Sequence, residues 1–196
     1  MNRLALVILA AGESRRFGAA KQLARIDGQP LLERVIDQCQ KIRGADLHVA
    51  LGARRDEIAA RIDLTGVEVI HSPRWYEGIG STIGSAVGGL QNHYEGILLL
   101  AGDQPLVGPD QLTPMILRWR QDCDLVCCAQ YSGTLGIPTI FPRRLFPRLI
   151  ALEGGHGAKK LLLEQEGNIL TFAIPEAGVD IDRAEDMRAL GQIPDV

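Results

Sequence analysis

The hydrophobic residues of this chain gather in short apolar runs that alternate with amphipathic stretches. Residues 4–9 are all apolar, a pattern typical of a strand buried on both faces of a parallel sheet. Further runs predict strands over residues 47–51, 67–70, 96–101, 125–128 and 169–174. Helices are expected over residues 31–42, where apolar residues follow helical spacing, and over residues 54–62 and 112–121. This alternation predicts a single-domain α/β fold, with a Rossmann-like, mostly parallel sheet flanked by helices and joined by right-handed crossovers. Residues 133–141 are expected to add one antiparallel edge.

The first predicted strand ends in small residues, which are Ala10, Ala11 and Gly12. Their lack of bulk lets the backbone turn and lets a ligand approach it closely. Open α/β sheets bind their ligands at this edge. The cations that follow are Arg15, Arg16 and Lys21, spaced around Gly18. Together with exposed backbone N–H groups they would suit a polyphosphate, so we interpret this segment as a triphosphate-binding loop.

The spacing of this loop excludes two familiar phosphate-binding patterns. Five residues separate Gly12 from Gly18 and no Gly-Lys-Ser/Thr follows, although a P-loop requires that tripeptide. The loop also lacks the G-x-G-x-x-G pattern of dinucleotide-binding folds. It therefore belongs to another class of nucleotide site.

A second glycine-rich segment, residues 71–90, contains five glycines and three serines close to a predicted helix start. Glycine inside a helix costs about 1 kcal/mol relative to alanine. Gly80, Gly84 and Gly88 therefore indicate a close approach of the backbone to a neighbour. For Gly84 and Gly88, packing of the helix on the sheet is an equally good explanation. The helix start also offers N–H groups to a polar ligand.

Acidic residues lie at two further positions of interest. Asp103 follows the predicted strand 96–101, where a carboxylate can hold a cation or simply cap a turn. Asp180 and Asp182 alternate late in the chain and would point to the same side of an extended segment. Asp182 also precedes a predicted helix, with Glu185 three residues on, which is the arrangement of a capping box. Capping alone could therefore explain Asp182.

Composition narrows the class of protein. The chain has 196 residues, enough for one domain with a sizeable core, and 46% are hydrophobic and 23% charged. A formal charge of -3 gives no global basic field for nucleic acid or anionic lipid. The N-terminal apolar run is too short for a signal peptide or a membrane span, so a cytoplasmic protein is expected. The cysteines show no C-x-x-C pair and no zinc-site spacing with histidine, which favours reduced, mostly buried thiols: Cys39, Cys123, Cys127 and Cys128.

Residues 9–21, LAAGESRRFGAAK, resemble the signature LAAGxSxRxGxxK of the MobA/MocA group of nucleotidyltransferases, and most closely that of the molybdenum cofactor cytidylyltransferases. Residues 102–105 are similar to the family's GDxP motif, whose aspartate binds magnesium, and residues 133–141 are similar to its GxPxxF stretch. Residues 180–186 resemble its DIDTPED. Residues 153–159 resemble its GDxGAR, but Gly155 stands in place of aspartate and Lys159 in place of arginine. Lysine keeps the charge and loses the bidentate geometry, which affects acceptor recognition more than triphosphate chemistry.

The resemblance implies a role for each matching position. The nucleotide would be bound by Ala10, Ala11, Gly12, Ser14, Gly18, Gly80, Ser81, Ser85 and Gly102. The catalytic residues would be Arg16, Lys21 and Asp103. Magnesium would be held by Asp103 together with either Asp182 or Asp180, and the sequence leaves this choice open. The acceptor would be bound by Gly136, Pro138, His156 and Lys159, although a loop histidine such as His156 is more often merely solvated.

The reaction implied by the resemblance is magnesium-dependent transfer of CMP from CTP to molybdenum-bound molybdopterin, with release of pyrophosphate. Within this family LAAG accompanies cytidine and LAGG guanine, so Ala11 favours CTP. Two anionic reactants need alignment and charge neutralisation, and no covalent nucleophile is required. Two alternatives stay open: a nucleotidyltransferase for a sugar or polyol phosphate, and a non-catalytic nucleotide- or cofactor-binding partner of a molybdoenzyme. Neither a nucleic acid nor a membrane is expected as a partner.

Overall fold

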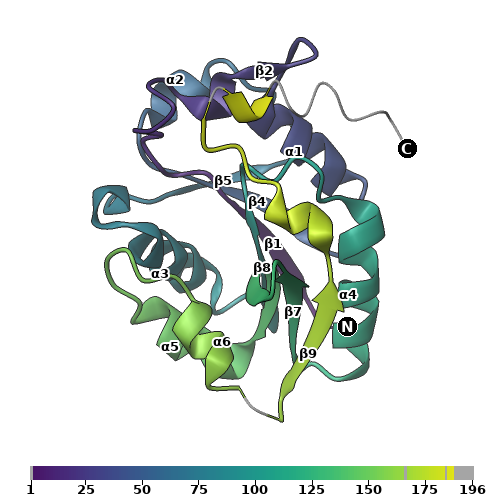
Figure 1. The fold of residues 1–196 in the computed structure, drawn as a ribbon. Helices are drawn as coiled ribbons and strands as arrows, with labels where there is room; N and C mark the ends of the chain where they lie inside the picture. Colours follow the sequence, from purple (N-terminus) through teal and green to yellow (C-terminus); the bar gives the residue numbers. More distant parts are fainter. Residues whose placement is uncertain (1, 166, 184, 188–196) are drawn as a thin grey trace.

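The computed structural model describes residues 2–165, 167–183 and 185–187. The strands are β1 Leu4–Leu9, β2 Arg25–Ile26, β3 Gln29–Pro30, β4 Asp46–Leu51, β5 Glu68–His71, β6 Gly96–Ala101, β7 Val126–Tyr131, β8 Thr134–Pro142 and β9 Ile169–Ala173. The α-helices are α1 Leu31–Gln40, α2 Arg55–Ala59, α3 Ile79–Leu90, α4 Pro109–Gln121, α5 Phe146–Ile150 and α6 Lys159–Leu163 (Figure 1). Short 3-10 helices cover Lys21–Leu23, Trp75–Glu77, Arg143–Leu145 and Pro175–Gly178.

The main sheet has seven strands in the order β5-β4-β1-β6-β8-β7-β9. β1 pairs in parallel with β4 on one side and with β6 on the other, and β4 pairs in parallel with β5. The chain thus moves outward from β1 to β4 and β5, and then returns to the opposite side of β1 as β6. An open α/β sheet forms its ligand crevice at such a reversal, outside the C-terminal ends of the strands. The topology therefore places the crevice beside the ends of β1 and β6.

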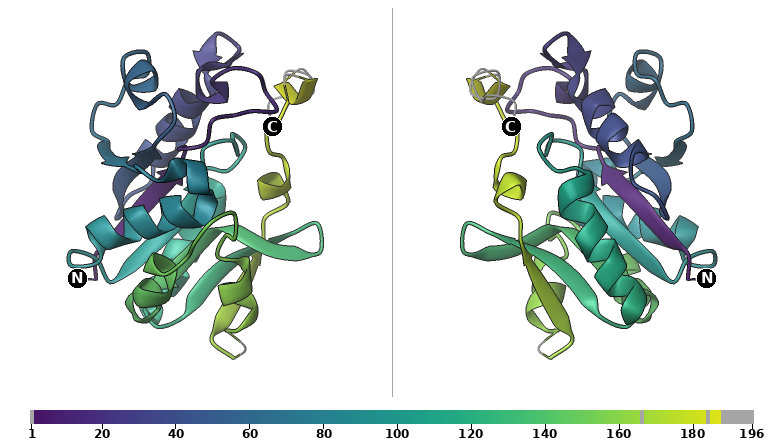
Figure 2. Two further views of the ribbon diagram at one scale, coloured as in Figure 1. Left: turned by 90° about the vertical axis from the view of Figure 1, so that its left-hand side faces the viewer. Right: turned by 90° about the vertical axis from the view of Figure 1, so that its right-hand side faces the viewer.

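Two hydrophobic layers sandwich this sheet because successive residues of a strand face opposite sides. In β1, Leu4, Leu6 and Ile8 pack with residues of α1, α2 and α4, whereas the odd-numbered residues pack with α3, α5 and α6. Figure 2 shows these two helical layers on either side of the sheet. All six residues of β1 are buried, which explains why its apolar run is uninterrupted.

The predicted α/β class, the mostly parallel sheet and its flanking helices are confirmed. The predicted position of the antiparallel strand is wrong, because β8 lies between β6 and β7 and not at an edge. A tight turn explains this placement, since Ser132 and Gly133 adopt positive φ values of 48° and 71° and return the chain directly from β7 into β8. The edge beyond β7 is formed by β9, which pairs with β7 in parallel.

Smaller differences concern the ends of elements. The helix expected over residues 112–121 begins three residues earlier, at Pro109, which suits the first position of a helix. Before α1, strands β2 and β3 form a short hairpin with Asp27 and Gly28 at positive φ. Within the described ranges, none of the helices combines the length and apolar character that crossing a bilayer requires.

Candidate active site

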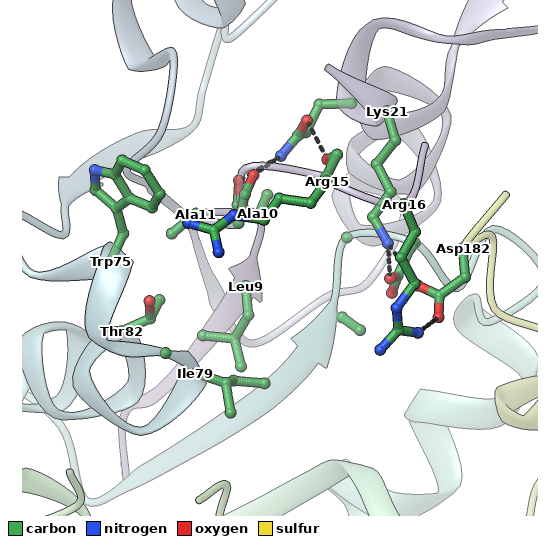
Figure 3. A pocket seen from close by; sticks show the side chains of 17 residues that line it. Leu9, Ala10, Ala11, Arg15, Arg16, Lys21, Trp75, Ile79, Thr82 and Asp182 are labelled. Atoms are coloured by element: carbon green, nitrogen blue, oxygen red, sulfur yellow. Dashed lines mark hydrogen bonds and ion pairs between the residues drawn. The ribbon is translucent and has the colours of Figure 1, made fainter. Parts of the chain in front are cut away.

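A cleft of about 550 Å3 opens at the C-terminal edge of the sheet, beside the ends of β1 and β6. Its walls come from the loop after β1, the start of α3, the turn after β6 and the late segment around residue 182. Figure 3 shows charged side chains on one side of the cleft and apolar ones on the other. We call these the charged end, formed by Arg16, Lys21, Asp103 and Asp182, and the apolar end, formed by Leu9, Trp75, Ile79 and Thr82.

Lys21 links the two carboxylates of the charged end. Its Nζ lies 2.5 Å from Asp103 Oδ2 and 3.3 Å from Asp182 Oδ1, and it donates a further hydrogen bond of 3.0 Å to the carbonyl oxygen of Ile181. The side chains of Lys21 and Asp103 are only 18% and 21% exposed, so water screens their attraction incompletely. Residues far apart in the sequence therefore meet on a single cationic group.

The segment after β9 carries Asp182 into the cleft. The Ile181 N–H donates to the carbonyl oxygen of Asp103 at 3.1 Å, which fixes this segment beside the end of β6. Arg16, whose side chain is 74% exposed, donates to Asp182 Oδ2 at 2.6 Å. Asp180 is exposed and is not among the described residues that line the cleft. Of the two late aspartates, the geometry thus brings Asp182 to Asp103.

The cap of the helix that follows Asp182 differs from the predicted one. Asp186 Oδ2 accepts hydrogen bonds from the backbone N–H groups of Asp182 at 2.9 Å and Arg183 at 2.7 Å. The carboxylate of Asp182 contacts Arg16 and Lys21, so capping does not explain it. Residues 185–187 are helical, and the remainder of the predicted helix lies outside the described residues.

The loop after β1 is anchored by Gln22, a residue that the sequence analysis missed. Gln22 is 4% exposed, and its Nε2 donates to the carbonyl oxygens of Ala10 at 2.9 Å and Gly12 at 3.0 Å. Its Oε1 accepts a long hydrogen bond of 3.4 Å from the Ser14 hydroxyl. The loop also turns through positive φ at Ser14 and at Gly18, with values of 60° and 78°. The main sequence signal for Gln22 is its position directly after Lys21. Because glutamine is usually a surface residue, the sequence did not predict that Gln22 would be buried.

Small residues bring the ends of β1 and β6 close together. The Gly102 N–H donates to the carbonyl oxygen of Leu9 at 3.0 Å, and a Cβ on Gly102 would lie 3.0 Å from the Cβ of Ala10. Ala11 and Gly12 continue the same wall of the cleft, and among the described residues, apart from Gly12 and its two chain neighbours, none has an atom within 4 Å of where a Gly12 Cβ would be. A ligand can therefore reach the backbone at this edge.

The apolar end depends on Trp75, whose role the sequence also did not indicate. Its side chain packs on Gly52, where an added Cβ would lie 2.4 Å from the Cβ of Trp75. Ile79, at the start of α3, is 41% exposed, as expected for an apolar side chain at the mouth of a cleft. Thr82 is 4% exposed and lies between Trp75 and Ile79 in Figure 3. These side chains offer flat and branched carbon surfaces to a ligand.

Three predicted nucleotide-binding residues of α3 lie outside the described lining of the cleft. The Ser81 hydroxyl donates to Glu77 Oε2 and the Ser85 hydroxyl to the carbonyl oxygen of Ser81, both at 2.8 Å. The Gly80 N–H donates to the carbonyl oxygen of Gly154 at 3.0 Å, and a Cβ on Gly80 would lie 2.7 Å from the carbonyl oxygen of His156. These groups make contacts within the helix and with residues 153–157, whereas Gly78, Ile79 and Thr82 line the cleft. Nucleotide binding by Gly80, Ser81 and Ser85 therefore stays a prediction.

The predicted acceptor-binding residues also lie outside the described lining of the cleft. Gly136 makes room for Tyr131, because a Cβ at residue 136 would lie 2.4 Å from the Tyr131 hydroxyl oxygen. Burial raises the pKa of this tyrosine. Pro138 is buried within β8, whereas His156 and Lys159 are exposed. Binding of an acceptor by Gly136, Pro138, His156 and Lys159 therefore stays a prediction.

The charged end has donors that suit a hard divalent cation. In the part of the chain that the structure describes, no three His, Cys, Asp or Glu side chains gather into a metal-binding group. Magnesium is commonly held by one or two carboxylates together with substrate phosphates and water. Asp103 and Asp182 supply two carboxylates that already converge on one cationic atom, the Nζ of Lys21. The residues present therefore fit magnesium bound together with a phosphate ligand.

The chain matches the MobA-like NTP transferase domain over residues 6–169. It belongs to this family. The match to the MobA-like domain includes the loop after β1 and Asp103, and it ends before the segment that carries Asp182.

Relatives of this MobA-like chain carry several names. The bifunctional protein GlmU of Sorangium cellulosum is 33% identical over 120 residues, which are 57% of this chain and 25% of GlmU. This chain therefore spans about a quarter of the length of the GlmU proteins it matches. A probable molybdenum cofactor guanylyltransferase of Geobacillus sp. strain WCH70 is 26% identical over 144 residues, which are 74% of this chain and 72% of that protein. The crystal structure of Rv0371c from Mycobacterium tuberculosis H37Rv is 27% identical, with a TM-score of 0.82 over 98% of each chain, and Rv0371c has also been solved in complex with manganese.

Proposed function

We propose that this chain transfers CMP from CTP to molybdenum-bound molybdopterin in a magnesium-dependent reaction that releases pyrophosphate. The observation that carries the proposal is the convergence of two cations and two carboxylates beside the loop after β1: Arg16, Lys21, Asp103 and Asp182. Membership of the MobA-like NTP transferase family supports nucleotidyl transfer. The relative named a probable molybdenum cofactor guanylyltransferase supports a molybdenum cofactor as the acceptor. A molybdoenzyme would then receive the product.

The reaction joins two anions. An oxygen of the acceptor phosphate attacks the α-phosphorus of CTP, and the bond from the α-phosphorus to the oxygen that bridges to the β-phosphate breaks. The released pyrophosphate keeps that oxygen and its electron pair. The protein must therefore align the reactants and neutralise their charge. Arg16 and Lys21, which line the cleft together, would bind the β- and γ-phosphates and stabilise the charge that grows as pyrophosphate leaves.

Asp103 and Asp182 are the residues that would hold magnesium. The ion would supply charge neutralisation at the phosphate oxygens. Lys21 contacts both carboxylates and reduces the repulsion between them, and Arg16 further balances the charge of Asp182. The charged end thus combines two positive and two negative side chains, an arrangement that can bind a metal and a polyphosphate together.

A second candidate is transfer of GMP from GTP. The name of the Geobacillus relative favours it, because that protein is described as a probable guanylyltransferase. Ala11 favours CTP, through the resemblance of its loop to the LAAG motif. The two reactions share their chemistry and differ in the base, so a direct comparison of nucleotides separates them.

The test is pyrophosphate release by the purified protein with magnesium, each of the four ribonucleoside triphosphates, and a panel of acceptors. The panel contains molybdenum-bound molybdopterin, a sugar phosphate and a polyol phosphate. We expect release that requires CTP, magnesium and the molybdopterin acceptor. The matched controls are Lys21→Ala, which should lose release, and Lys41→Ala at the exposed C-terminal end of α1, which should keep it.

Each other outcome contradicts a defined part of the proposal. Release that requires GTP would assign the guanylyl reaction. Release with a sugar or polyol phosphate alone would replace the acceptor and keep nucleotidyl transfer. Binding of CTP without release in any combination would favour a non-catalytic binding partner of a molybdoenzyme.

A further inference from the structure

The segment that carries Asp182 into the cleft is attached to the turn after β6 at two points. One is the hydrogen bond that the Ile181 N–H donates to the carbonyl oxygen of Asp103 at 3.1 Å. The other comes from the side chain of Gln104, whose Nε2 donates to the carbonyl oxygen of Ala177 at 2.7 Å. Ala177 lies in the 3-10 helix that precedes Asp182, in the yellow part of the chain in Figure 1. Two neighbouring residues of one turn thus hold both ends of the stretch that leads to Asp182.

The amide of Gln104 donates to two carbonyl oxygens at once. Gln104 is 3% exposed, and its Nε2 also donates to the carbonyl oxygen of Ile137 in β8 at 3.3 Å. Turning the amide over would place Oε1 against the carbonyl oxygens of Ile137 and Ala177, neither of which can donate, so these acceptors determine its orientation. Ala177 is only 2% exposed, and a buried carbonyl oxygen that loses its donor is costly. Gln104 therefore fixes the start of the segment.

The contacts of the Asp182 carboxylate are of a different kind. They join it to Arg16 at 2.6 Å and to Lys21 at 3.3 Å, and the side chains of Asp182 and Arg16 are 42% and 74% exposed. Exposed ion pairs contribute little to holding a side chain in place. In the proposed function both cations also bind the β- and γ-phosphates, which draws them away from Asp182. With a nucleotide bound, the position of the carboxylate then depends on the backbone that carries it.

We propose that Gln104 is a positioning residue for Asp182, which it keeps beside Asp103 when a nucleoside triphosphate and magnesium are bound. The inference rests on the proposed function, because it takes Asp182 as a magnesium ligand. Groups behind the ligands of a metal site commonly orient those ligands, and their loss weakens metal binding. Gln104 is not among the described residues that line the cleft, so it acts through Asp182 and not on the nucleotide.

The test measures binding of CTP and GTP by calorimetry, with magnesium and with EDTA, in the absence of an acceptor. The ratio of the two affinities is the gain that the metal gives. Gln104→Met keeps the length of the side chain and removes the donor. Gln104→Asn is a milder second variant, because its amide is drawn back by one methylene group and cannot keep both hydrogen bonds without movement of the backbone.

Two further variants complete the test. Asp182→Asn is made alone and together with Gln104→Met, which gives a double-mutant cycle. Gln165→Met is the matched control, because Gln165 is also a buried glutamine, at 7% exposure, and its Oε1 accepts from Arg144 outside the described lining of the cleft. Thermal unfolding establishes that each variant retains its fold.

We expect Gln104→Met to reduce the gain from magnesium by about tenfold, as loss of a group behind a metal ligand does, and to leave binding in EDTA unchanged. Gln104→Asn should act in the same direction with a smaller effect. Asp182→Asn should reduce the gain at least as much, and adding Gln104→Met to it should have no further effect, because Gln104 acts through Asp182. Gln165→Met should leave both affinities unchanged.

Three results would overturn the inference alone, provided that Asp182→Asn reduces the gain. These are an unchanged gain in both Gln104 variants, an equal loss of affinity with magnesium and with EDTA, and additive effects in the double variant. An unchanged gain in Asp182→Asn would instead remove the proposed metal ligand. Failure of the unaltered protein to bind any nucleoside triphosphate would overturn the proposed function and this inference together.

Discussion

The N-terminal ends of the parallel strands form one edge of the sheet and their C-terminal ends form the other. Both of these edges carry ion pairs and a cavity, yet their side chains are arranged differently. At the N-terminal edge, Arg3 pairs with Asp46 at 2.7 Å, with both side chains more than half exposed, and its guanidinium lies 4.6 Å from the centre of the Tyr94 ring. The hydroxyl oxygen of Tyr94 in turn lies 3.1 Å from Nε2 of the buried His48. At the C-terminal edge, Lys21 is mostly buried between two carboxylates that also face a cleft.

Cavity volume does not distinguish these edges. The N-terminal edge contains a cavity of about 430 Å3, against about 550 Å3 for the cleft. The difference lies in what the walls offer. At the N-terminal edge, Arg3 is directed at Asp46 and at the Tyr94 ring, and exposed ion pairs of this kind contribute little to stability. The cleft has small residues, reachable backbone and two carboxylates brought together, which are features of a ligand site.

The largest expected effect is that of Lys21→Ala set against Arg3→Ala. Removing Lys21 should lower kcat/KM for pyrophosphate release by about a hundredfold or more, because a charge-stabilising donor is lost. Removing Arg3, at the opposite edge, should leave kcat/KM unchanged. Steady-state rates of both variants check this, and a Lys21→Ala rate close to that of the unaltered protein would remove Lys21 from the mechanism.

Asp103→Asn should weaken the response to magnesium. One of two carboxylates at the charged end is then neutral, so the magnesium concentration for half-maximal activity should rise by about tenfold. Asp182→Asn should act in the same direction. Asp46→Asn, the matched change at the N-terminal edge, should not alter the magnesium titration. Identical titrations for Asp103→Asn and the unaltered protein would rule out the proposed metal ligand.

Gln22→Leu tests whether the loop after β1 must be anchored. The carbonyl oxygens of Ala10 and Gly12 would lose their donors, so the free energy of unfolding should fall by about 1–3 kcal/mol. Nucleotide affinity should fall with it, because the loop is no longer fixed. Gln40→Leu is the control, since Gln40 donates to the carbonyl oxygen of Thr65 in an exposed loop. Denaturant unfolding and calorimetry measure both quantities, and equal affinity for both variants would contradict the anchoring role.

The smallest expected effect concerns stability at mildly acid pH. Burial lowers the pKa of His48 below the ordinary histidine value of 6.5; Arg3 adds to this effect, and Glu68 and Asp46 oppose it. Below pH 6.5 the unfolded chain therefore binds a proton more readily than the folded one. Stability is lost as the pH falls from 6.5 toward the lowered pKa. His48→Gln should flatten this part of the stability profile without changing kcat, and denaturant unfolding across that range checks it.

The sequence predicted those parts of the site that lie at the ends of apolar runs. Lys21 and Asp103 follow the first and the fourth strand of the parallel part of the sheet, so their meeting at one edge follows from topology. The choice between Asp180 and Asp182 depends on how one short segment crosses that edge, and local pattern carries no information about it. The sequence did not indicate the roles of Gln22 and Trp75 for a related reason, because their surroundings include segments that are distant in the sequence.

The sequence also could not separate packing from binding at the glycines of α3. Glycine is required wherever another group comes close, and the group can be a ligand or the protein itself. At Gly80 the neighbour is the backbone of residues 153–157, and at Gly84 it is the carbonyl oxygen of Ile150. The order of strands β8 and β7 posed the same kind of problem, since alternation along a strand does not indicate which strand lies beside it.

The hydrogen bond from the Ile181 N–H to the Asp103 carbonyl oxygen has a consequence for biosynthesis. A ribosome delivers the loop after β1 and the turn after β6 well before it delivers Asp182. The growing polypeptide can therefore pair β1 with β4 and β6 while Lys21 still has a single aspartate beside it. The second aspartate docks only after β9 has been made, so the contact between Lys21 and Asp182 forms later than the contact between Lys21 and Asp103.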